Sequence, residues 1–298
     1  GLSQEYVDKI KDALHDKKTL FLDFYSTRFK IWFEVSAFPS AQGLFIYFRD
    51  ITKRKRQEML LALEKETLEM NARHLTSLKD TTDFLLSGLE RAFEGMFCSV
   101  LIKQADDNTL ETLSAPSLPK PYSDAINGIA IGPNKGSCGT AMYLKQNVIV
   151  SDIQESELWN DFKVLAENNG LRSCWSFPIF SSQSQPLATF AIYYSEIKEP
   201  SAEEFPVIER MVNILRIIIE NKQSEEKIKI SNERYLLATM ATNDAIWDAD
   251  LIGNTIYWGE GFHTLFGYKA GYFADFNGVW ESYIHPQDKN RVIDGLAR

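Results

Sequence analysis

Two long helix-forming stretches divide this chain into three blocks, and they constrain its fold more than any other feature. The first, KRKRQEMLLALEKETLEMNARHLTSL, spans residues 53–78 without a glycine or a proline and is rich in residues that favour helix. The second begins at Ser201, whose hydroxyl suits a helix N-cap, with Glu203 and Glu204 in the first turn. We therefore expect compact domains joined by helices.

The first helix has a seam that predicts coiled-coil packing. Its seam residues alternate at steps of three and four, which is the heptad period. The histidine of this seam is either a half-exposed packing residue or, as the weaker alternative, a group that titrates near neutral pH. The seam consists of Leu60, Leu63, Thr67, Met70 and His74.

The second helix is too long for its own domain. Ile208, Val212, Leu215 and Ile219 step by four, three and four, and part of this face must cover the preceding sheet. The helix then continues through ENKQSEEKIKISNERYLLATM, beyond the reach of that sheet. A parallel copy of the same helix is the simplest partner for the remaining apolar positions, so we predict a homodimer.

The three blocks are rich in strand patterns. A short amphipathic helix over residues 5–14 precedes three β-rich runs within 20–50. Residues 76–200 alternate strand pairs with helices, which predicts an antiparallel sheet flanked by helices and an α+β fold class. After Met240, AIWDADL and NTIYWGEG predict two strands, and GFHTLFGY predicts a short helix. The first and last blocks look partial, so we expect a piece of a longer chain.

Composition excludes several function classes. A net charge of −9 without a basic stripe argues against nucleic-acid binding. The most apolar helical run, Met211–Ile219, is far shorter than the roughly 20 residues that span a bilayer, and no signal peptide is recognisable, so we expect a cytoplasmic segment without a membrane span. Scattered histidines give no zinc spacing. Cys98, Cys138 and Cys174 form no CxxC pair and predict reduced, buried thiols.

Two stretches resemble PAS domains. KIWFEVSAFPSAQGLFIYFRDITKRK resembles the C-terminal strands of such a domain, and its Asp-Ile-Thr at residues 50–52 matches the signature where a PAS domain continues into a signalling helix. AIWDADLIGNTIYWGEGFHTLFGY, followed by VWESYIHPQDKNRV, resembles the N-terminal part of another PAS domain, including the corner at residues 285–288. The resemblance implies two partial PAS domains.

Between them, KGSCGTAMYLKQNVIVSDI and LWNDFKVLAENNGLRSCWSFPI resemble a GAF domain of the kind found in bacterial sensor histidine kinases. The order of these resemblances along the chain, PAS, GAF and PAS, implies a sensory and dimerising segment of a two-component protein. It would relay a signal along paired helices to an output kinase domain of the same chain, without catalysing a reaction itself. The sensory region of a cyclic-di-GMP enzyme is the alternative. The implied parts are a partial PAS domain over 1–52, a helical linker over 53–75, a GAF domain over 76–200 with a flanking helix to about 222, a signalling helix over 201–238 and a partial PAS domain over 239–298.

Asp50 and Thr52 are the candidate relay residues. At a strand-to-helix junction they can exchange hydrogen bonds between the domain core and the helix. The simpler interpretation is that Thr52 is an N-cap, worth about 1 kcal/mol.

The glycine-rich stretch GPNKGSCGTA, residues 132–141, is either reactive or structural. Free methionine-R-sulfoxide reductases share the GAF fold and a similar GxCG turn, so a thiol redox enzyme is an alternative function. In those enzymes the reduction needs a second, exposed cysteine that precedes the strand containing the Pro-Ile pair. Here that strand is LRSCWSFPIF, and Cys174 falls inside it. A phosphate loop would end in Gly-Lys-Ser/Thr, which is not found here. We expect Gly136 and Gly139 to allow a sharp turn into a helix that starts near Thr140.

An unidentified small molecule in the GAF pocket is the remaining hypothesis, and the sequence assigns no cofactor. The bilin, cyclic-nucleotide, flavin and haem patterns are not recognisable. Aromatic residues of this pocket are either ligand contacts or core, and its arginine is either a ligand contact or half of a surface ion pair. The candidates are Trp159, Phe162, Arg172, Trp175 and Tyr193, with Asp152 and Cys138 at the rim.

Overall fold

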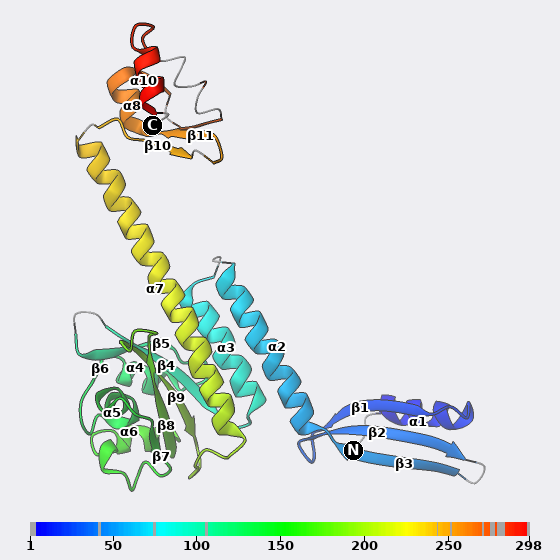
Figure 1. The fold of residues 1–298 in the computed structure, drawn as a ribbon. Helices are drawn as coiled ribbons and strands as arrows, with labels where there is room; N and C mark the ends of the chain where they lie inside the picture. Colours follow the sequence, from blue (N-terminus) through cyan, green and yellow to red (C-terminus); the bar gives the residue numbers. More distant parts are fainter. Residues whose placement is uncertain are drawn as a thin grey trace. The chain divides into compact units, whose positions relative to one another are not determined.

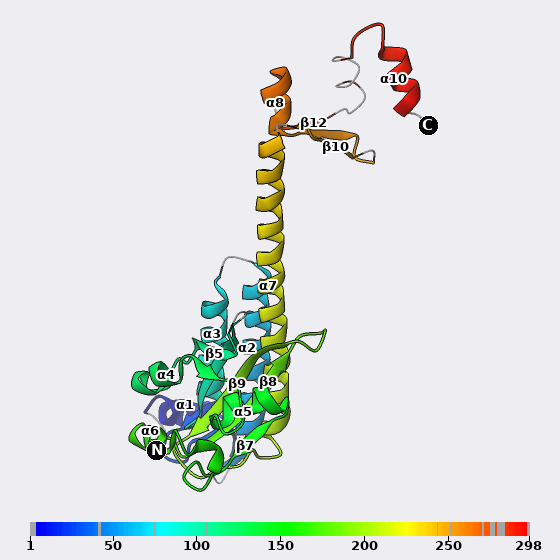
Figure 2. The same ribbon diagram turned by 90° about the vertical axis from the view of Figure 1, so that its left-hand side faces the viewer.

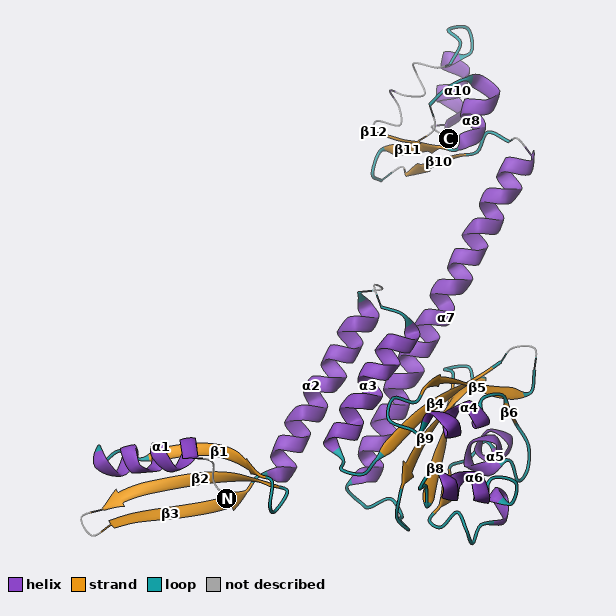
Figure 3. Ribbon diagram, turned by 180° about the vertical axis from the view of Figure 1, so that it is seen from behind, coloured by secondary structure: helices purple, strands orange, loops and turns teal. Residues whose placement is uncertain are grey.

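The computed structural model describes residues 4–40, 43–73, 76–104, 107–242, 244–250, 252–269, 271–274, 278 and 284–296. Figures 1 to 3 show the fold from three sides. The chain divides into two compact units, Gly1–Lys222 and Gln223–Arg298. Among the described helices, none is long and apolar enough to cross a membrane.

The first unit opens with a three-stranded antiparallel sheet of order β1-β2-β3, as the alternating patterns predicted. A helix lies against β1 and β2, and the ring of Tyr6 is 5.6 Å from that of Phe24. Val35 and Ala37 are fully buried, whereas β3 is exposed along almost all of its length. The elements are α1 (Gln4–His15), β1 (Leu20–Ser26), β2 (Ile31–Ser40) and β3 (Gly43–Asp50).

A six-stranded antiparallel sheet of order β6-β5-β4-β9-β8-β7 forms the centre of the first unit. Helices cover both of its faces, and Figure 2 looks onto the face that carries α4, α5 and α6. The predicted strands are confirmed, while the two-residue β6 and the short α4 were not predicted. The elements are β4 (Phe97–Lys103), β5 (Thr109–Ser114), α4 (Lys120–Ile126), β6 (Ile129–Ala130), α5 (Gly136–Leu144), β7 (Val148–Val150), the 3-10 turn η1 (Glu157–Trp159), α6 (Lys163–Asn168), β8 (Ser173–Phe180) and β9 (Pro186–Tyr194).

The opposite face of this sheet is covered by α3 and the first part of α7, as far as Lys222, and α2 packs against these two helices. The three helices lie side by side in Figures 1 and 3, and their buried residues share one core cluster with β4, β8 and β9. Ile208, Leu215 and Ile219 of α7 are buried in this cluster, as the spacing predicted for part of that face. The helices are α2 (Thr52–Ala72), α3 (Leu78–Ala92) and α7 (Glu204–Thr242).

The seam of α2 packs inside the same chain. Leu60, Leu63 and Thr67 are buried, and a Cβ atom added at Gly88 of α3 would lie 2.3 Å from Leu63 Cδ1. The α2–α3 contact therefore depends on a glycine. The predicted seam residues serve an intrachain interface, and His74, the last of them, lies outside the described residues.

The glycine turn is structural, but the helix starts earlier than predicted. Gly136 is the first residue of α5 and has a φ of +60°, which favours glycine. A Cβ atom at Gly139 would lie 2.5 Å from the carbonyl oxygen of Ala130. The predicted start near Thr140 was wrong because Gly139 lies within the helix and serves a close backbone approach.

The second unit has a small antiparallel sheet of order β10-β11-β12. Its described core centres on Trp258, whose indole stacks on Phe262 with ring centroids 4.8 Å apart. The two strands and the short helix predicted here are confirmed, and β12 is an addition. The elements are β10 (Trp247–Asp250), β11 (Thr255–Trp258), α8 (Glu260–Phe266), β12 (Gly271–Ala274) and α10 (Lys289–Leu296).

Candidate functional site

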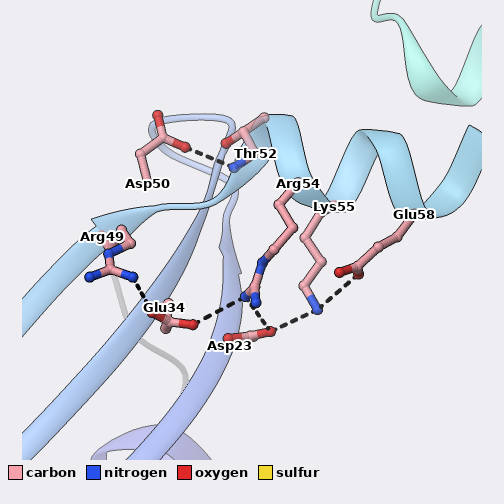
Figure 4. A network of polar contacts seen from close by, with 8 residues as sticks. All are labelled: Asp23, Glu34, Arg49, Asp50, Thr52, Arg54, Lys55 and Glu58. Carbon is pink, nitrogen blue, oxygen red and sulfur yellow. Dashed lines mark hydrogen bonds and ion pairs between the residues drawn. The ribbon is translucent and has the colours of Figure 1, made fainter.

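The junction between β3 and α2 joins a sheet to a helix through Thr52. Its backbone N–H donates to Asp50 Oδ1 at 2.9 Å (Figure 4). Its hydroxyl accepts from the backbone N–H of Trp32 at 3.0 Å. Hydrogen bonds from the hydroxyl and the N–H of Thr52 lower the pKa of the Asp50 carboxyl. Asp50 and Thr52, both predicted from the sequence, are thus brought together.

The expectation that Thr52 is an N-cap is wrong. Ile51 occupies the N-cap position without a side-chain cap, and Thr52 is the first residue of α2. Its hydroxyl instead accepts a hydrogen bond from the backbone N–H of Trp32 on β2, twenty residues earlier in the chain. The backbone N–H of Ile51 also donates to the carbonyl of Trp32 at 2.8 Å. The first turn of α2 is therefore fixed to the middle strand of the N-terminal sheet.

A row of alternating charges runs from the sheet onto α2 (Figure 4). Asp23 and Glu34 stand directly opposite each other on β1 and β2, an unfavourable pairing of like charges. Arg54 lies 3.2 Å from Glu34 and 3.6 Å from Asp23, and Lys55 Nζ is 2.7 Å from Asp23. The first turns of α2 thereby neutralise the two carboxylates, and the hydrogen bond to Asp23 raises the pKa of Lys55.

The ends of the row are weaker. Arg49 extends it on β3, 3.5 Å from Glu34, and Glu58 extends it along α2, 3.8 Å from Lys55. These pairs are partly exposed, and such pairs contribute about 0–1 kcal/mol each. We expect these ion pairs to contribute mainly to the orientation of α2, because they favour one face of the helix toward the sheet. Sequence reasoning missed the row, although the KRKR run at residues 53–56 was its visible signal.

On the other face of the six-stranded sheet, four predicted pocket residues surround a cavity of about 10 Å³. These are Cys138 of α5, Trp159 of η1, Phe162 and Tyr193 of β9. A cavity of this volume holds one water molecule at most. Tyr122, which sequence reasoning missed, fills much of the space, with its ring 5.6 Å from that of Tyr193 in an edge-to-face arrangement. The pocket is therefore occupied by its own side chains.

The thiols beside this cavity are buried and free of disulfides. A hydrogen bond with the thiol of Cys174 lowers the pKa of Cys138 to about 7 against the opposing effect of burial, whereas burial raises the pKa of Cys174. Cys138 Sγ also lies 3.9 Å from the hydroxyl of Tyr193. Cys174 packs inside β8, as predicted, so solvent reaches neither sulfur readily.

Three predicted pocket residues lie elsewhere. Trp175 points to the opposite face of the sheet, which α3 and α7 cover, and its indole N–H donates to the carbonyl of Lys198 at 2.9 Å. Arg172 pairs with Asp152 at 2.8 Å, which lowers the pKa of the Asp152 carboxyl. The arginine is 40% exposed, so the pair matches the surface ion pair that the sequence left as the alternative.

The start of α7 is anchored to the end of β9. Ser201 and Glu204 form a reciprocal capping box, with N–H to side-chain distances of 2.9 and 3.2 Å, which confirms the predicted N-cap. The buried Glu204 carboxylate also accepts from Lys198 at 2.9 Å and from the Tyr194 hydroxyl at 3.0 Å. Burial acts to raise the pKa of Glu204, but these hydrogen bonds outweigh it and lower the pKa. Lys198 and Tyr194 were not found from the sequence.

The comparisons with known proteins bear directly on this region. The family model for the GAF domain matches residues 76–220. This part of the chain is a GAF domain, with a curled antiparallel sheet flanked by helices, as the resemblance implied. Within the described residues, no group of acidic, histidine or cysteine side chains is arranged to hold a metal ion.

One curated relative is the methyl sulfide methyltransferase-associated sensor of Methanosarcina acetivorans. It is 33% identical over 206 residues, which is 69% of this chain, and the chain spans about a fifth (20%) of that protein's length. A GAF domain together with a sensor as a relative is consistent with a sensory role.

Solved structures share the fold at low identity. The GAF domain of a phosphoenolpyruvate-protein phosphotransferase from Coxiella burnetii is 14% identical, with a TM-score of 0.47 over 56% of this chain and 96% of that one. Free methionine-R-sulfoxide reductase from Neisseria meningitidis is 16% identical, with a TM-score of 0.45 over 57% of this chain and 91% of that one. These similarities concern the fold alone.

Proposed function

We propose that this chain is the sensory and dimerising segment of a signal-transduction protein, most simply a histidine kinase. In this proposal, a partial PAS domain over 1–52 passes a signal through α2 to the GAF domain. The continuing helix passes it to a second partial PAS domain over 239–298 and then to an output kinase domain of the same chain. The observation that carries the proposal is the Thr52 junction. Through this junction the start of α2 is bonded to the N-terminal sheet, and the rest of α2 packs on the GAF domain.

The first step of the relay is the attachment of α2 to the N-terminal sheet. The bond from Trp32 to Thr52 and the charge row around Arg54 both act on the first turn of the helix. A shift or rotation of the sheet therefore moves this turn. A signal requires a stimulus that favours one of two packings, and this attachment is the place where the two packings would differ.

The second step runs from α2 to the other helices of the GAF domain. Leu63 packs against Gly88 of α3, and Glu64 accepts a hydrogen bond from Arg210 Nε of α7 at 2.9 Å. Lys53 also reaches Glu203, just before α7, at 2.9 Å. Displacing α2 would thus change its contacts with both neighbouring helices. The capping box of Ser201 and Glu204 would pass the displacement of α7 to β9, because Glu204 accepts a hydrogen bond from Tyr194 at the end of that strand.

Dimerisation rests on the part of α7 that follows the GAF domain. Ile228 and Tyr235 are seven residues apart, as are Ile230 and Leu237, and all four are exposed. A spacing of seven places the two members of each pair on one face of the helix, as in a coiled coil, while the two pairs lie on different faces. We assign Ile228 and Tyr235 to the face that meets the partner. The proposed partner is a parallel copy of this helix.

Native mass spectrometry of the chain tests the dimer. We expect a dimer that an Ile228→Glu, Tyr235→Glu double variant converts to a monomer, because buried carboxylates would replace apolar contacts. A matched control, Lys229→Glu with Glu233→Lys, preserves the net charge and the apolar positions and should remain dimeric. A monomeric wild-type chain would contradict the paired-helix relay.

The small cavity restricts the hypothesis that the GAF pocket binds a small molecule. A ligand bound beside Cys138 requires Tyr122, Trp159 or Tyr193 to move aside, since the existing space admits at most one water molecule. The same spectra test it, because a dimer with excess mass would reveal a retained small molecule. A mass equal to that of the polypeptide supports a GAF domain that transmits through its packing.

A further inference from the structure

A groove separate from the GAF cavity lies between the N-terminal sheet and the helices α2 and α3. Its volume is about 760 Å³, within the range of roughly 300–1,000 Å³ that is typical of small-molecule sites. The relay proposed above uses residues at its edge but gives no role to the space itself. All three walls belong to the first compact unit.

One wall of the groove is aromatic. The rings of Tyr25 and Trp32, on β1 and β2, are 5.6 Å apart at an angle of 50°. Lys55 Nζ lies 5.6 Å from the centroid of the Trp32 ring. Tyr25 is 45% exposed, so this wall offers a partly open aromatic surface on which a flat ring can stack.

The other walls carry an excess of positive charge. Two lining cations are already paired, since Lys30 contacts Glu94 and Lys55 lies 2.7 Å from Asp23. Within the part of the chain that the structure describes, the guanidinium groups of Arg56 and Arg91 form no direct hydrogen bond or ion pair. Each interacts with a carboxylate only at longer range, Arg56 with Glu203 and Arg91 with Glu90. A chain of net charge −9 thus has, at this groove, two arginines that no carboxylate contacts directly, although Glu58 also lines it.

The two arginines come from different elements. Arg56 belongs to α2, where its guanidinium lies 4.9 Å from the centroid of the Phe93 ring. Stacking of this kind leaves the N–H donors at the edge of the guanidinium plane available to an acceptor. Arg91 is exposed near the end of α3. An acceptor that meets both would therefore connect the two helices.

We propose that this groove binds an organic anion with a flat ring. The ring stacks on Trp32 and Tyr25, and a carboxylate or phosphate group of the ligand accepts hydrogen bonds from Arg56 and Arg91. Guanidinium groups bind both kinds of acceptor through paired, charge-assisted hydrogen bonds. Because its walls come from the N-terminal sheet and from the GAF helices, an occupied groove would hold the two at one spacing. The proposal adds an effector site and does not depend on dimerisation.

Isothermal titration calorimetry on the complete chain tests this site with named probes. Adenosine monophosphate and 2-naphthoate supply a ring with a phosphate or a carboxylate, while adenosine and inorganic phosphate each lack one feature. We expect at least one ring-bearing anion to bind with a Kd below about 1 mM, and each control compound to bind at least about tenfold more weakly than that anion. The anion that binds distinguishes a phosphate from a carboxylate ligand.

Variants locate the binding. Arg56→Gln and Arg91→Gln should each weaken binding of that anion by about tenfold or more, since each removes a charge-assisted contact. The matched control Arg73→Gln changes an exposed arginine at the end of the same helix and should bind like the wild type. On the unaltered chain, raising the salt concentration should weaken binding through screening. The site is refuted if neither ring-bearing anion binds below about 1 mM, if both arginine variants bind normally, or if salt has no effect.

Discussion

The hydroxyl of Thr52 accepts a hydrogen bond from the backbone N–H of Trp32, at 3.0 Å, and so attaches the first residue of a helix to the middle strand of the preceding sheet. The same residue donates its own N–H to Asp50. Thr52 is thus bonded on both sides of the turn that connects β3 to α2. Removal of the hydroxyl would therefore leave the Trp32 N–H without this acceptor.

Thr52→Val tests this attachment, since it keeps the shape of the side chain and removes the hydroxyl. We expect the free energy of unfolding to fall by about 1 kcal/mol, the net value of a partly buried hydrogen bond. Urea denaturation of the purified chain measures it. Thr52→Ser retains the acceptor and should lie closer to the wild type. Equal stability of the valine and wild-type proteins would show that the bond is not made.

Gly88→Ala probes the contact between α2 and α3. The new methyl group would start 2.3 Å from Leu63 Cδ1, so the helices must separate or Leu63 must change rotamer. Overpacking of this kind costs about 1–3 kcal/mol, despite the better helix propensity of alanine. Thermal unfolding followed by circular dichroism gives the change. Ser87→Ala, one residue earlier on the same helix, is the control and should leave the melting temperature nearly unchanged.

Glu204 makes stability depend on acidity. Its pKa is lower in the folded chain than in the unfolded chain, where the pKa of a glutamate is about 4.3. Below that value the unfolded state binds more protons, so the stabilisation from Glu204 is complete above the unfolded pKa and is lost as the pH falls through the folded pKa. Glu204→Gln should be less stable than the wild type at pH 7, and the difference should shrink in acid. Urea unfolding at several pH values measures it, and a difference that is constant with pH would contradict this account.

The three thiols should resist modification in the folded chain. Cys98, Cys138 and Cys174 are all buried, and inaccessible thiols react slowly whatever their pKa. We expect labelling by iodoacetamide to be at least about tenfold slower than for the unfolded chain. Cys138 should be modified before Cys174, because the pKa of Cys138 is lowered and that of Cys174 is raised. Mass spectrometry of peptides identifies the site. Rapid labelling of Cys138 at native pH would instead favour a reactive thiol.

The sequence predicted most elements because their signals are local. Alternation over residues 20–50 and the capping residues around Ser201 are patterns within a few positions, and the structure follows them. Thr52 was misassigned because its partner, Trp32, lies twenty residues away across a strand pairing. A hydroxyl next to a helix start looks the same from the sequence whether it caps the helix or bonds a neighbouring strand.

Pocket residues were harder to assign for a different reason. All but the last residue of β8 are buried, so polarity does not alternate along the strand and its two faces are indistinguishable in the sequence. Trp175 was placed in the predicted pocket, but its neighbour Cys174 is the one that belongs to the core on the pocket side, because neighbouring residues of a strand point to opposite faces. Tyr122 escaped notice because it lies on a short helix within a stretch that looked like a loop.

The opposed carboxylates Asp23 and Glu34 have a consequence for protein engineering. Their neutralising partners, Arg54 and Lys55, lie beyond the end of the sheet, on the helix that follows. A chimaera recombined at residue 51 would inherit the acidic pair from one parent and the start of the helix from another. Unless the second parent has basic residues at these two positions, the hybrid leaves Asp23 without a counterion and Glu34 with Arg49 alone. A crossover point after Lys55 keeps the four residues together and is the better place to exchange modules.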